Sequence, residues 1–345
     1  MAQSTSAAAN DSSPLRAVAD LLEIAGSLPP KSVVIPGGDR DDDLRLVESA
    51  RDHGIVDRCV LIGDGPEIRA AARRVGIDVS DADIIATFCP EDTASRTMDI
   101  VRTGEADIIL KGNISTPILN RAMLGIATRP TISLVTMFDA TPIAGGRPML
   151  LTDPGVTTSC TFERMVCLVE NAVEVAQAIM GIDRPRVAIL SANEKIIKSL
   201  PSTAMGKALS DRHWADALVY GPLSFDMAVS AESVRLKDVE FEGVAAEVAG
   251  KADILVCPGL DSANILYKVI MEIVKYGLGT FAGVTMGVMT PYVILSRADN
   301  VATKLLSIAL SSIAKQRMQW GVPGPAATDG NSQPGDQDAT NQRQE

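Results

Sequence analysis

The chain has 345 residues, of which 46% are hydrophobic and 22% are charged, and this composition indicates a globular protein with enough apolar surface for about two domains. Its formal net charge of -11 excludes the class of proteins that bind nucleic acid nonspecifically, because those proteins need a basic surface. The apolar runs are much shorter than the ~20 residues of a membrane-spanning helix. We therefore expect neither a nucleic acid nor a membrane as a partner.

Cysteine and histidine usage limits the chemistry further. The five cysteines are odd in number, scattered and without the spacing of metal ligands, which favours a reduced cytoplasmic location over a secreted disulfide scaffold. His53 and His213 lie on polar stretches that we expect to be helical, so neither a histidine-dependent triad nor a zinc site is expected. Residues 1–13 are expected to form a polar tail without the features of a signal peptide.

Helices and strands alternate regularly in the first third of the chain. We predict helices at 15–28, 39–53, 67–75, 94–104 and 116–123, and strands at 32–36, 59–63, 82–87 and 106–110. The strands are continuous apolar runs, which is typical of strands that are buried on both faces. This pattern predicts a parallel sheet covered by helices on both sides.

The middle of the chain interrupts this pattern with a hairpin. Strands are predicted at 131–137 and 149–151, joined by a turn at 143–148. Further elements are a long helix at 163–180, a strand at 187–190, a helix at 202–209, a strand at 217–220 that ends at Gly221-Pro222, a strand at 253–257 and a helix from about 262. Beyond Trp320 the composition is that of a disordered acidic tail.

The segment 283–304 carries the strongest signal for a site. It is predicted to contain an apolar strand at 284–289, a turn at Thr290-Pro291, a short strand at 292–295, and then the sequence SRADN, which opens a helix. A hydroxyl, a guanidinium and the positive end of a helix dipole in one place are typical of a phosphate site. The alternative is an ordinary helix cap, for which Ser, Asp and Asn are common, with a solvated arginine beside it.

Other polar residues follow predicted strands in the same way. In an open α/β sheet, ligands bind beyond the carboxyl ends of the strands, and Lys111-Gly112-Asn113 stands directly after one of them. The alternative is a plain polar turn. The fragment Gly63-Asp64-Gly65-Pro66 lacks the third glycine of a dinucleotide fingerprint. Because neither His53 nor His213 is expected to act in a triad or a zinc site, the predicted catalysis depends on positioning and on stabilisation of an oxyanion.

Three segments, in order, resemble the phosphate acetyl/butyryl transferase family: GPLSFDMAVS (221–230), ADILVCPGLDSANILYK (252–268) and PYVILSRADN (291–300). ADIILKG (106–112), LLTD (150–153) and NAVEVAQA (171–178) extend the resemblance to about residues 20–315. GPLSFD and SRAD are closer to the phosphate butyryltransferase branch.

The resemblance implies an α/β fold of two domains like that of isocitrate and isopropylmalate dehydrogenases, with mostly parallel sheets flanked by helices and an active site in the interdomain cleft. Domain I would be discontinuous, with residues 14–148 plus 288–320, and domain II would span 149–287, between tails at 1–13 and 321–345. It also implies a homo-oligomer and the reversible conversion of acyl-CoA and phosphate to acyl phosphate and CoA. CoA would be a substrate, with no tightly bound cofactor and no metal.

The resemblance also assigns roles to residues. Ser296 matches the serine that stabilises the carbonyl oxygen as it becomes an oxyanion, and Arg297 matches the arginine that binds phosphate. Asp299 is a candidate base for the CoA thiol. The remaining residues expected to bind substrate are Lys111, Gly112, Ser133, Asp153, Asp226, Asn264, Tyr267 and Lys268.

Two positions depart from the family pattern. Acetyltransferase members carry an acidic base seven residues after the serine, where this chain has Thr303. The family usually has an asparagine four residues after the aspartate of LTD, where this chain has Thr157. Either Asp299 replaces the missing base, or Arg297 and the helix terminus stabilise the thiolate without one. A second hypothesis is therefore an impaired paralogue that only binds CoA or acyl phosphate. A third, a nicotinamide-dependent hydroxy-acid dehydrogenase of the same fold, would need both a metal-binding aspartate cluster on one helix and a dinucleotide loop, and we identify neither motif in the sequence.

Overall fold

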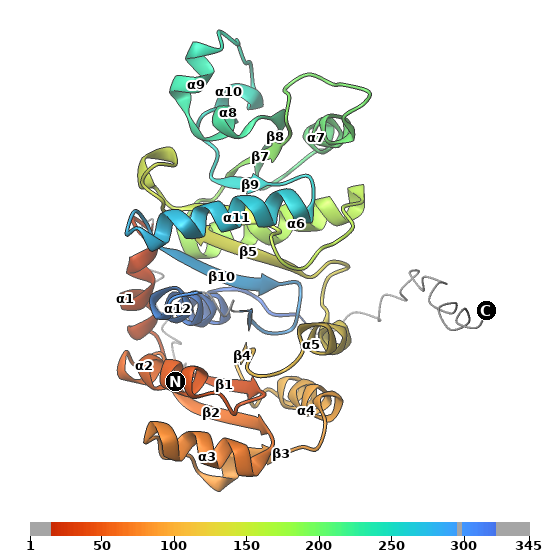
Figure 1. Ribbon diagram of the computed structural model, residues 1–345. Helices are drawn as coiled ribbons and strands as arrows, with labels where there is room; N and C mark the ends of the chain where they lie inside the picture. Colours follow the sequence, from red (N-terminus) through yellow and green to blue (C-terminus); the bar gives the residue numbers. More distant parts are fainter. Residues whose placement is uncertain (1–14, 295–298, 322–345) are drawn as a thin grey trace, which may run out of the picture.

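The computed structural model describes residues 15–294 and 299–321, and the strands in these residues form one 11-stranded sheet with helices on both faces (Figure 1). The strands are β1 (Lys31–Pro36), β2 (Val56–Gly63), β3 (Ile84–Ala86), β4 (Ile108–Leu110), β5 (Ser133–Phe138), β6 (Met149–Thr152), β7 (Arg186–Leu190), β8 (Leu218–Leu223), β9 (Ile254–Val256), β10 (Phe281–Met286) and β11 (Tyr292–Val293). Their order is β3-β2-β1-β4-β11-β10-β5-β6-β9-β7-β8. The predicted α/β class with a mostly parallel sheet is confirmed.

The helices lie close to their predicted positions. They are α1 (Leu21–Gly26), α2 (Asp41–Asp52), α3 (Gly65–Val75), α4 (Pro90–Thr103), α5 (Thr116–Met123), α6 (Phe162–Val175), α7 (Pro201–Asp211), α8 (Phe225–Val229), α9 (Ala231–Leu236), α10 (Val244–Val248), α11 (Leu260–Lys275) and α12 (Val301–Arg317). The long helix predicted at 163–180 becomes a π-helical turn after Val175. The helix predicted at 15–28 is shorter than expected, with a 3-10 turn at Val18–Asp20 before α1.

Strand β1 shows why the first part of the sheet is covered on both faces. Its residues Val33, Val34 and Ile35 are all fully buried. Side chains alternate between the faces of a strand, so Val33 and Ile35 pack with residues of α2, α3 and α12, whereas Val34 packs with residues of α4 and α5. β2 and β4 pair with β1 in parallel, and β11 pairs in parallel with β4.

The predicted hairpin is confirmed and joins two parallel groups of strands. β5 and β6 pair in antiparallel fashion, and β10 is antiparallel to both β5 and β11. On the far side, β6, β9, β7 and β8 are parallel to one another. Because three antiparallel pairings separate the two groups, the group from β6 to β8 runs opposite to β1 and β4. The carboxyl ends of the two groups therefore lie at opposite edges of the sheet.

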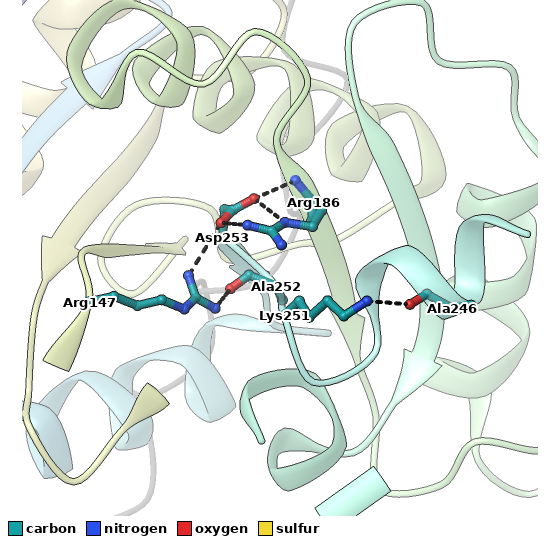
Figure 2. A network of polar contacts seen from close by, with 6 residues as sticks. All are labelled: Arg147, Arg186, Ala246, Lys251, Ala252 and Asp253. Carbon is teal, nitrogen blue, oxygen red and sulfur yellow. Dashed lines mark hydrogen bonds and ion pairs between the residues drawn. The ribbon is translucent and has the colours of Figure 1, made fainter. Parts of the chain in front are cut away.

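A buried carboxylate and two half-buried guanidinium groups hold together the amino ends of the second parallel group (Figure 2). Asp253, just before β9, is 2% exposed and accepts hydrogen bonds from the guanidinium of Arg186 in β7 at 2.8 and 2.9 Å. Arg147, which precedes β6, also donates to Asp253 at 3.3 Å and to the carbonyl of Ala252. One carboxylate thus links the starts of three strands, and the loops that contact α11 follow the carboxyl ends of β6 and β9.

The C-terminal segment folds largely as predicted, although β10 ends earlier. β10 ends at Met286 because Gly287 turns the chain with a left-handed φ of +86°, where an added Cβ would lie 2.5 Å from the Thr131 carbonyl oxygen. After β11, Asn300 caps α12 by accepting the N–H of Thr303 at 2.7 Å. The end of the predicted strand, Leu295, and the predicted residues Ser296 and Arg297 lie outside the described residues.

The predicted end of the strand at 217–220 is also wrong. The strand expected at 217–220 does not end at Gly221-Pro222, because β8 continues to Leu223, whose carbonyl accepts the N–H of Ser191 at 2.8 Å. Gly221 permits this close pairing, since an added Cβ would lie 2.5 Å from the carbonyl oxygen of Ile189. Within the part of the chain that the structure describes, no helix is both long and apolar enough to cross a membrane.

Candidate functional site

Helix α11 carries three of the predicted substrate-binding residues: Asn264, Tyr267 and Lys268. Its buried face consists of Ala263, Tyr267, Ile270, Met271 and Val274, at the spacing of one helical stripe. Asn264 and Tyr267 are three residues apart, so their side chains are neighbours on the surface of the helix. α11 therefore presents a polar amide and a phenol next to each other.

Asn264 faces the loop that follows β6. Its side-chain amide donates to the carbonyl of Pro154 at 2.9 Å. This loop and the first turns of α11 enclose a hollow of about 440 Å³, which is lined by Pro154, Gly155, Leu260, Asp261, Asn264 and Ile265. The hollow is open to solvent, and its lining combines apolar side chains with one amide and one carboxylate.

Asp153 organises this loop from within. It is 3% exposed, and its Oδ1 accepts the backbone N–H groups of Leu134, Gly155 and Val156 at 3.1, 3.0 and 3.1 Å. Its Oδ2 accepts the N–H of Thr157 at 2.8 Å. Burial raises the pKa of Asp153, although these hydrogen bonds oppose the rise. The described contacts thus make Asp153 an anchor of the loop, and its predicted contact with substrate stays a prediction.

Tyr267 connects α11 to Asp299, which precedes α12. The tyrosine hydroxyl donates to Oδ1 of Asp299 at 3.2 Å. The phenol ring packs against Phe281 with a centroid separation of 5.2 Å, and the ammonium of the exposed Lys268 lies 4.5 Å from the ring centroid. Burial, together with the neighbouring carboxylate of Asp299, raises the pKa of Tyr267. The structure therefore brings together three residues that the sequence predicted for the site.

Lys111 and Gly112 lie at the carboxyl end of β4, as predicted. The N–H of Lys111 donates to the carbonyl of Val293 at 3.1 Å, so β4 ends next to the end of β11. The Lys111 ammonium donates to the Gly112 carbonyl at 3.2 Å. Gly112 permits close packing of two loops, because an added Cβ would lie 2.3 Å from the carbonyl oxygen of Gly37. Both residues thus lie next to the end of β11.

Asp43 is a titratable group near this position that the sequence reasoning missed. It lies in the first turn of α2 and is 5% exposed, and its Oδ2 has no hydrogen-bond partner within the described parts of the chain. Burial raises the pKa of Asp43 even though the positive charges of Arg40, Lys304 and Lys111 oppose the rise. In the sequence, Asp43 is one of three consecutive aspartates at a helix start, which is an ordinary pattern. The one sequence signal for the burial of Asp43 is that it stands next to Leu44, which the helical pattern places on the buried side of α2.

Two predicted residues make their described contacts elsewhere. Ser133 is fully buried at the start of β5, where its hydroxyl accepts the side-chain amide of Asn171 at 2.7 Å. Asp226 lies in α8 and forms an ion pair with Lys237 at 3.0 Å. Burial opposes ionisation of Asp226, but hydrogen bonds from Lys237 and Ser224 outweigh it and lower the pKa. These contacts explain both residues structurally, and their substrate role remains a prediction.

Thr303, at the position of the family base, is buried in the first turn of α12. Its side chain is 2% exposed, and its hydroxyl oxygen has no hydrogen-bond partner among the residues that the structure describes. A threonine hydroxyl cannot accept a thiol proton at neutral pH. The nearest described carboxylate in the sequence is that of Asp299, which is partly exposed. Among the residues that the structure describes, no group of three or more His, Cys, Asp or Glu side chains is arranged to hold a metal ion.

Comparisons with known proteins agree on one family. The family model described as "Phosphate acetyl/butaryl transferase" matches residues 85–312. A phosphate butyryltransferase of Clostridium acetobutylicum is 35% identical over 291 residues, which cover 82% of this chain and 93% of that protein. A phosphate acetyltransferase of Thermotoga maritima is 34% identical over 263 residues, which cover 74% of this chain and 85% of that protein.

Solved structures show the same relationship. A branched-chain phosphotransacylase from Enterococcus faecalis aligns with a TM-score of 0.69 and 29% identity over 84% of this chain and 100% of that one. A phosphotransacetylase from Streptococcus pyogenes, at 20% identity, shares the fold with a TM-score of 0.66 over 87% of this chain and 98% of that one. From the family match, the two relatives and this fold, we conclude that the chain belongs to the phosphate acetyl/butyryl transferase family.

Proposed function

We propose that the protein catalyses the reversible transfer of a short-chain acyl group between CoA and inorganic phosphate, with acyl-CoA and phosphate on one side and acyl phosphate and CoA on the other. The observation that carries this proposal is the 35% identity to a phosphate butyryltransferase over 93% of that protein's length. SRAD and GPLSFD favour a butyryl-like substrate. CoA and phosphate then enter as substrates, and the chemistry needs no tightly bound cofactor.

The proposed chemistry assigns three roles within the sequence SRAD. A phosphate oxygen attacks the thioester carbonyl, and Ser296 donates a hydrogen bond to the oxyanion that forms, a contribution of about 3 kcal/mol in comparable enzymes. Arg297 binds the phosphate through its forked guanidinium. The C–S bond then breaks, and the CoA thiolate leaves with the electron pair and takes a proton from the protonated carboxyl group of Asp299. The proton that hydrogen phosphate brings to the site returns Asp299 to its protonated form. In the reverse direction, Asp299 accepts the thiol proton as sulfur attacks the acyl phosphate.

The Tyr267–Asp299 contact supports the choice of Asp299 as the proton-transfer group. A carboxylate can exchange a proton with a thiol if it is held within reach, whereas the threonine at position 303 cannot. Asp299 is partly exposed and lies at the start of α12, and α11 beside it carries Asn264 and the hollow. Helix α11 therefore lies against both the hollow, where we expect the acyl or thiol end of the substrate, and Asp299, the expected base.

The remaining assignments complete the proposal. Asn264, Lys268, Lys111 and Gly112 bind substrate, with Asp153 supporting the loop next to Asn264 and with Ser133 and Asp226 as further candidates. We propose the dehydrogenase-like division into domain I (14–148 plus 288–320) and domain II (149–287), with the substrates between them, and the tails at 1–13 and 321–345. We further propose that the protein is a cytoplasmic homo-oligomer.

A catalytically impaired, CoA-binding paralogue is the second candidate. Thr303 favours this candidate, because it stands where acetyltransferase members carry the acidic base. Its side chain is not acidic and is only 2% exposed. Binding of CoA with no acyl transfer is the result that this candidate predicts.

One assay distinguishes the two functions. The purified protein is incubated with acetyl-, butyryl- and isobutyryl-CoA, with and without inorganic phosphate, and released thiol is measured with a chromogenic disulfide. We expect phosphate-dependent release that is fastest with a four-carbon acyl group. Absence of release with every acyl-CoA would overturn the proposed activity. In that case, calorimetric titration with CoA decides whether binding survives without turnover.

A further inference from the structure

The contact between Tyr267 and Asp299 joins two elements that are far apart in the sequence. The hydroxyl oxygen of Tyr267, in the middle of α11, lies 3.2 Å from Oδ1 of Asp299, which stands two residues before the start of α12. A hydrogen bond from a neutral hydroxyl to a carboxylate is charge-assisted and stronger than a neutral pair. The side chain of Asp299 is therefore oriented from a helix outside its own segment.

The surroundings of Tyr267 hold the phenol in a fixed position. The residue is 9% exposed, and its ring lies at 51° to that of Phe281 with a centroid separation of 5.2 Å. The ammonium of Lys268 lies 4.5 Å from the ring centroid. A ring in this environment has little surface left for a substrate. A role in direct substrate binding, which the sequence suggested, therefore fits Tyr267 less well than a role through its hydroxyl.

The hydroxyl of Tyr267 also stays protonated, so it remains a hydrogen-bond donor. Burial and the negative charge of Asp299 both raise the pKa of Tyr267, so its proton stays in place throughout the neutral and mildly alkaline range. The donor therefore does not change state while Asp299 accepts or releases a proton. An orienting group with these properties suits a carboxylate that exchanges protons.

We propose that Tyr267 is a positioning residue, whose hydroxyl holds the carboxylate of Asp299 in the orientation from which it exchanges a proton with the CoA thiol. This inference rests on the proposed function, because it takes Asp299 as the proton-transfer group. The proposed role of Tyr267 is therefore to position Asp299 and not to bind the substrate. It also explains how α11, through Asn264 and Tyr267, contacts both the hollow and Asp299.

The test is a double-mutant cycle with Tyr267→Phe and Asp299→Asn, measured in the butyryl-CoA and phosphate assay. Tyr267→Phe removes one oxygen and keeps the ring packed against Phe281. We expect it to lower kcat roughly tenfold, the effect of losing one hydrogen bond to a charged group, with the KM values of both substrates unchanged. Asp299→Asn should lower kcat about 100-fold. In the Asp299→Asn background, Tyr267→Phe should have no further effect on kcat.

Tyr292→Phe is the matched control. Tyr292 is also buried, and its hydroxyl donates to a side-chain oxygen, that of Asn120, at 3.3 Å. Tyr292 belongs to the hydrophobic cluster on the side of α4 and α5, which is a different cluster from that of Tyr267. We expect Tyr292→Phe to change the unfolding temperature as much as Tyr267→Phe does, and to leave kcat unchanged.

The outcomes separate this inference from the proposed function. An increased KM for butyryl-CoA with unchanged kcat would assign Tyr267 to substrate binding, and an equal loss of kcat in the Asp299→Asn background would show that it acts independently of Asp299. Either result overturns the inference while the acyltransferase activity stands. Full activity of Asp299→Asn removes the base that the inference requires, and the absence of turnover in the unmodified protein removes the proposed function itself.

Discussion

The side-chain amide of Asn264 donates to the carbonyl of Pro154 at 2.9 Å and so fastens the loop after β6 to the second turn of α11. Both residues line the hollow of about 440 Å³. Asp153 anchors the same loop from inside through four backbone N–H groups, those of Leu134, Gly155, Val156 and Thr157. The wall of the hollow therefore depends on one contact to the helix and on one buried carboxylate.

Replacement of Asn264 by Ala should loosen this wall. The loss of one neutral hydrogen bond, about 1 kcal/mol, predicts a KM for butyryl-CoA that is roughly fivefold higher, with a smaller change in kcat. Steady-state kinetics at varied acyl-CoA concentration measure it. The control is Ser262→Ala on the same helix, which removes a hydrogen bond to Gly259 and should leave KM unchanged. An unaltered KM in Asn264→Ala would show that the hollow does not hold the substrate.

Asp43 predicts a pH dependence of stability. Burial raises its pKa above the ordinary value of 3.8, so the folded chain binds this proton more tightly than the unfolded chain does. The free energy of unfolding therefore decreases as the pH rises from about 3.8 through the higher pKa of the folded state, despite the nearby Arg40, Lys304 and Lys111. Asp43→Asn cannot ionise and avoids this loss.

We expect Asp43→Asn to be more stable than the unmodified protein at pH 8 by about 1 kcal/mol, with the difference disappearing near pH 4. Thermal unfolding at a series of pH values measures this difference. Asp42→Asn, at the exposed neighbouring position, is the control and should show no such trend. If Asp43→Asn is less stable than the unmodified protein at pH 8, the fold favours the charged form of Asp43 and the predicted pH dependence is wrong.

The ion network around Asp253 predicts a large loss of stability without a loss of chemistry. Asp253→Asn would leave the guanidinium groups of Arg186 and Arg147 without their buried counter-charge, and we expect a decrease of about 3 kcal/mol in the free energy of unfolding. Urea titration measures it. Glu170→Gln, which breaks the exposed pair with Arg212, is the control and should cost less than about 1 kcal/mol.

At a temperature where Asp253→Asn remains folded, its KM and kcat should match those of the unmodified protein. The network joins the starts of β6, β7 and β9, whereas the loops that contact α11 follow the ends of β6 and β9 (Figure 2). A selective decrease in kcat in folded Asp253→Asn would contradict this separation of stability from catalysis.

Arg297→Ala should weaken the use of phosphate. The loss of a forked, charge-assisted interaction predicts a KM for phosphate higher by on the order of 30-fold, with the KM for acyl-CoA changed little. Initial rates at varied phosphate concentration measure it. Arg317→Ala, near the other end of α12, removes a hydrogen bond to the Ala178 carbonyl and serves as the control. An unchanged phosphate dependence in Arg297→Ala would remove this arginine from the site.

Local patterns predicted much of the architecture. The limits of α5 match the prediction at both ends, and the β5–β6 hairpin was visible from two apolar runs around a glycine-rich turn. Asn300 caps α12 as the polar sequence before the helix suggested. These features depend on residues within a few positions of one another, so propensity and hydrophobic period are enough to predict them.

The sequence by itself determined the class of fold, the order of the elements and the motifs that place the chain in its family. Only the tertiary structure decided that one sheet contains two parallel groups of opposite direction, that Tyr267 lies against Asp299, and that Asp43 is buried while its neighbour Asp42 is exposed. The physical reason is that strand pairing and side-chain contacts between distant segments depend on how the whole chain packs. Local propensity carries no information about which of two adjacent aspartates, or which phenol 32 residues away, comes to face a given group.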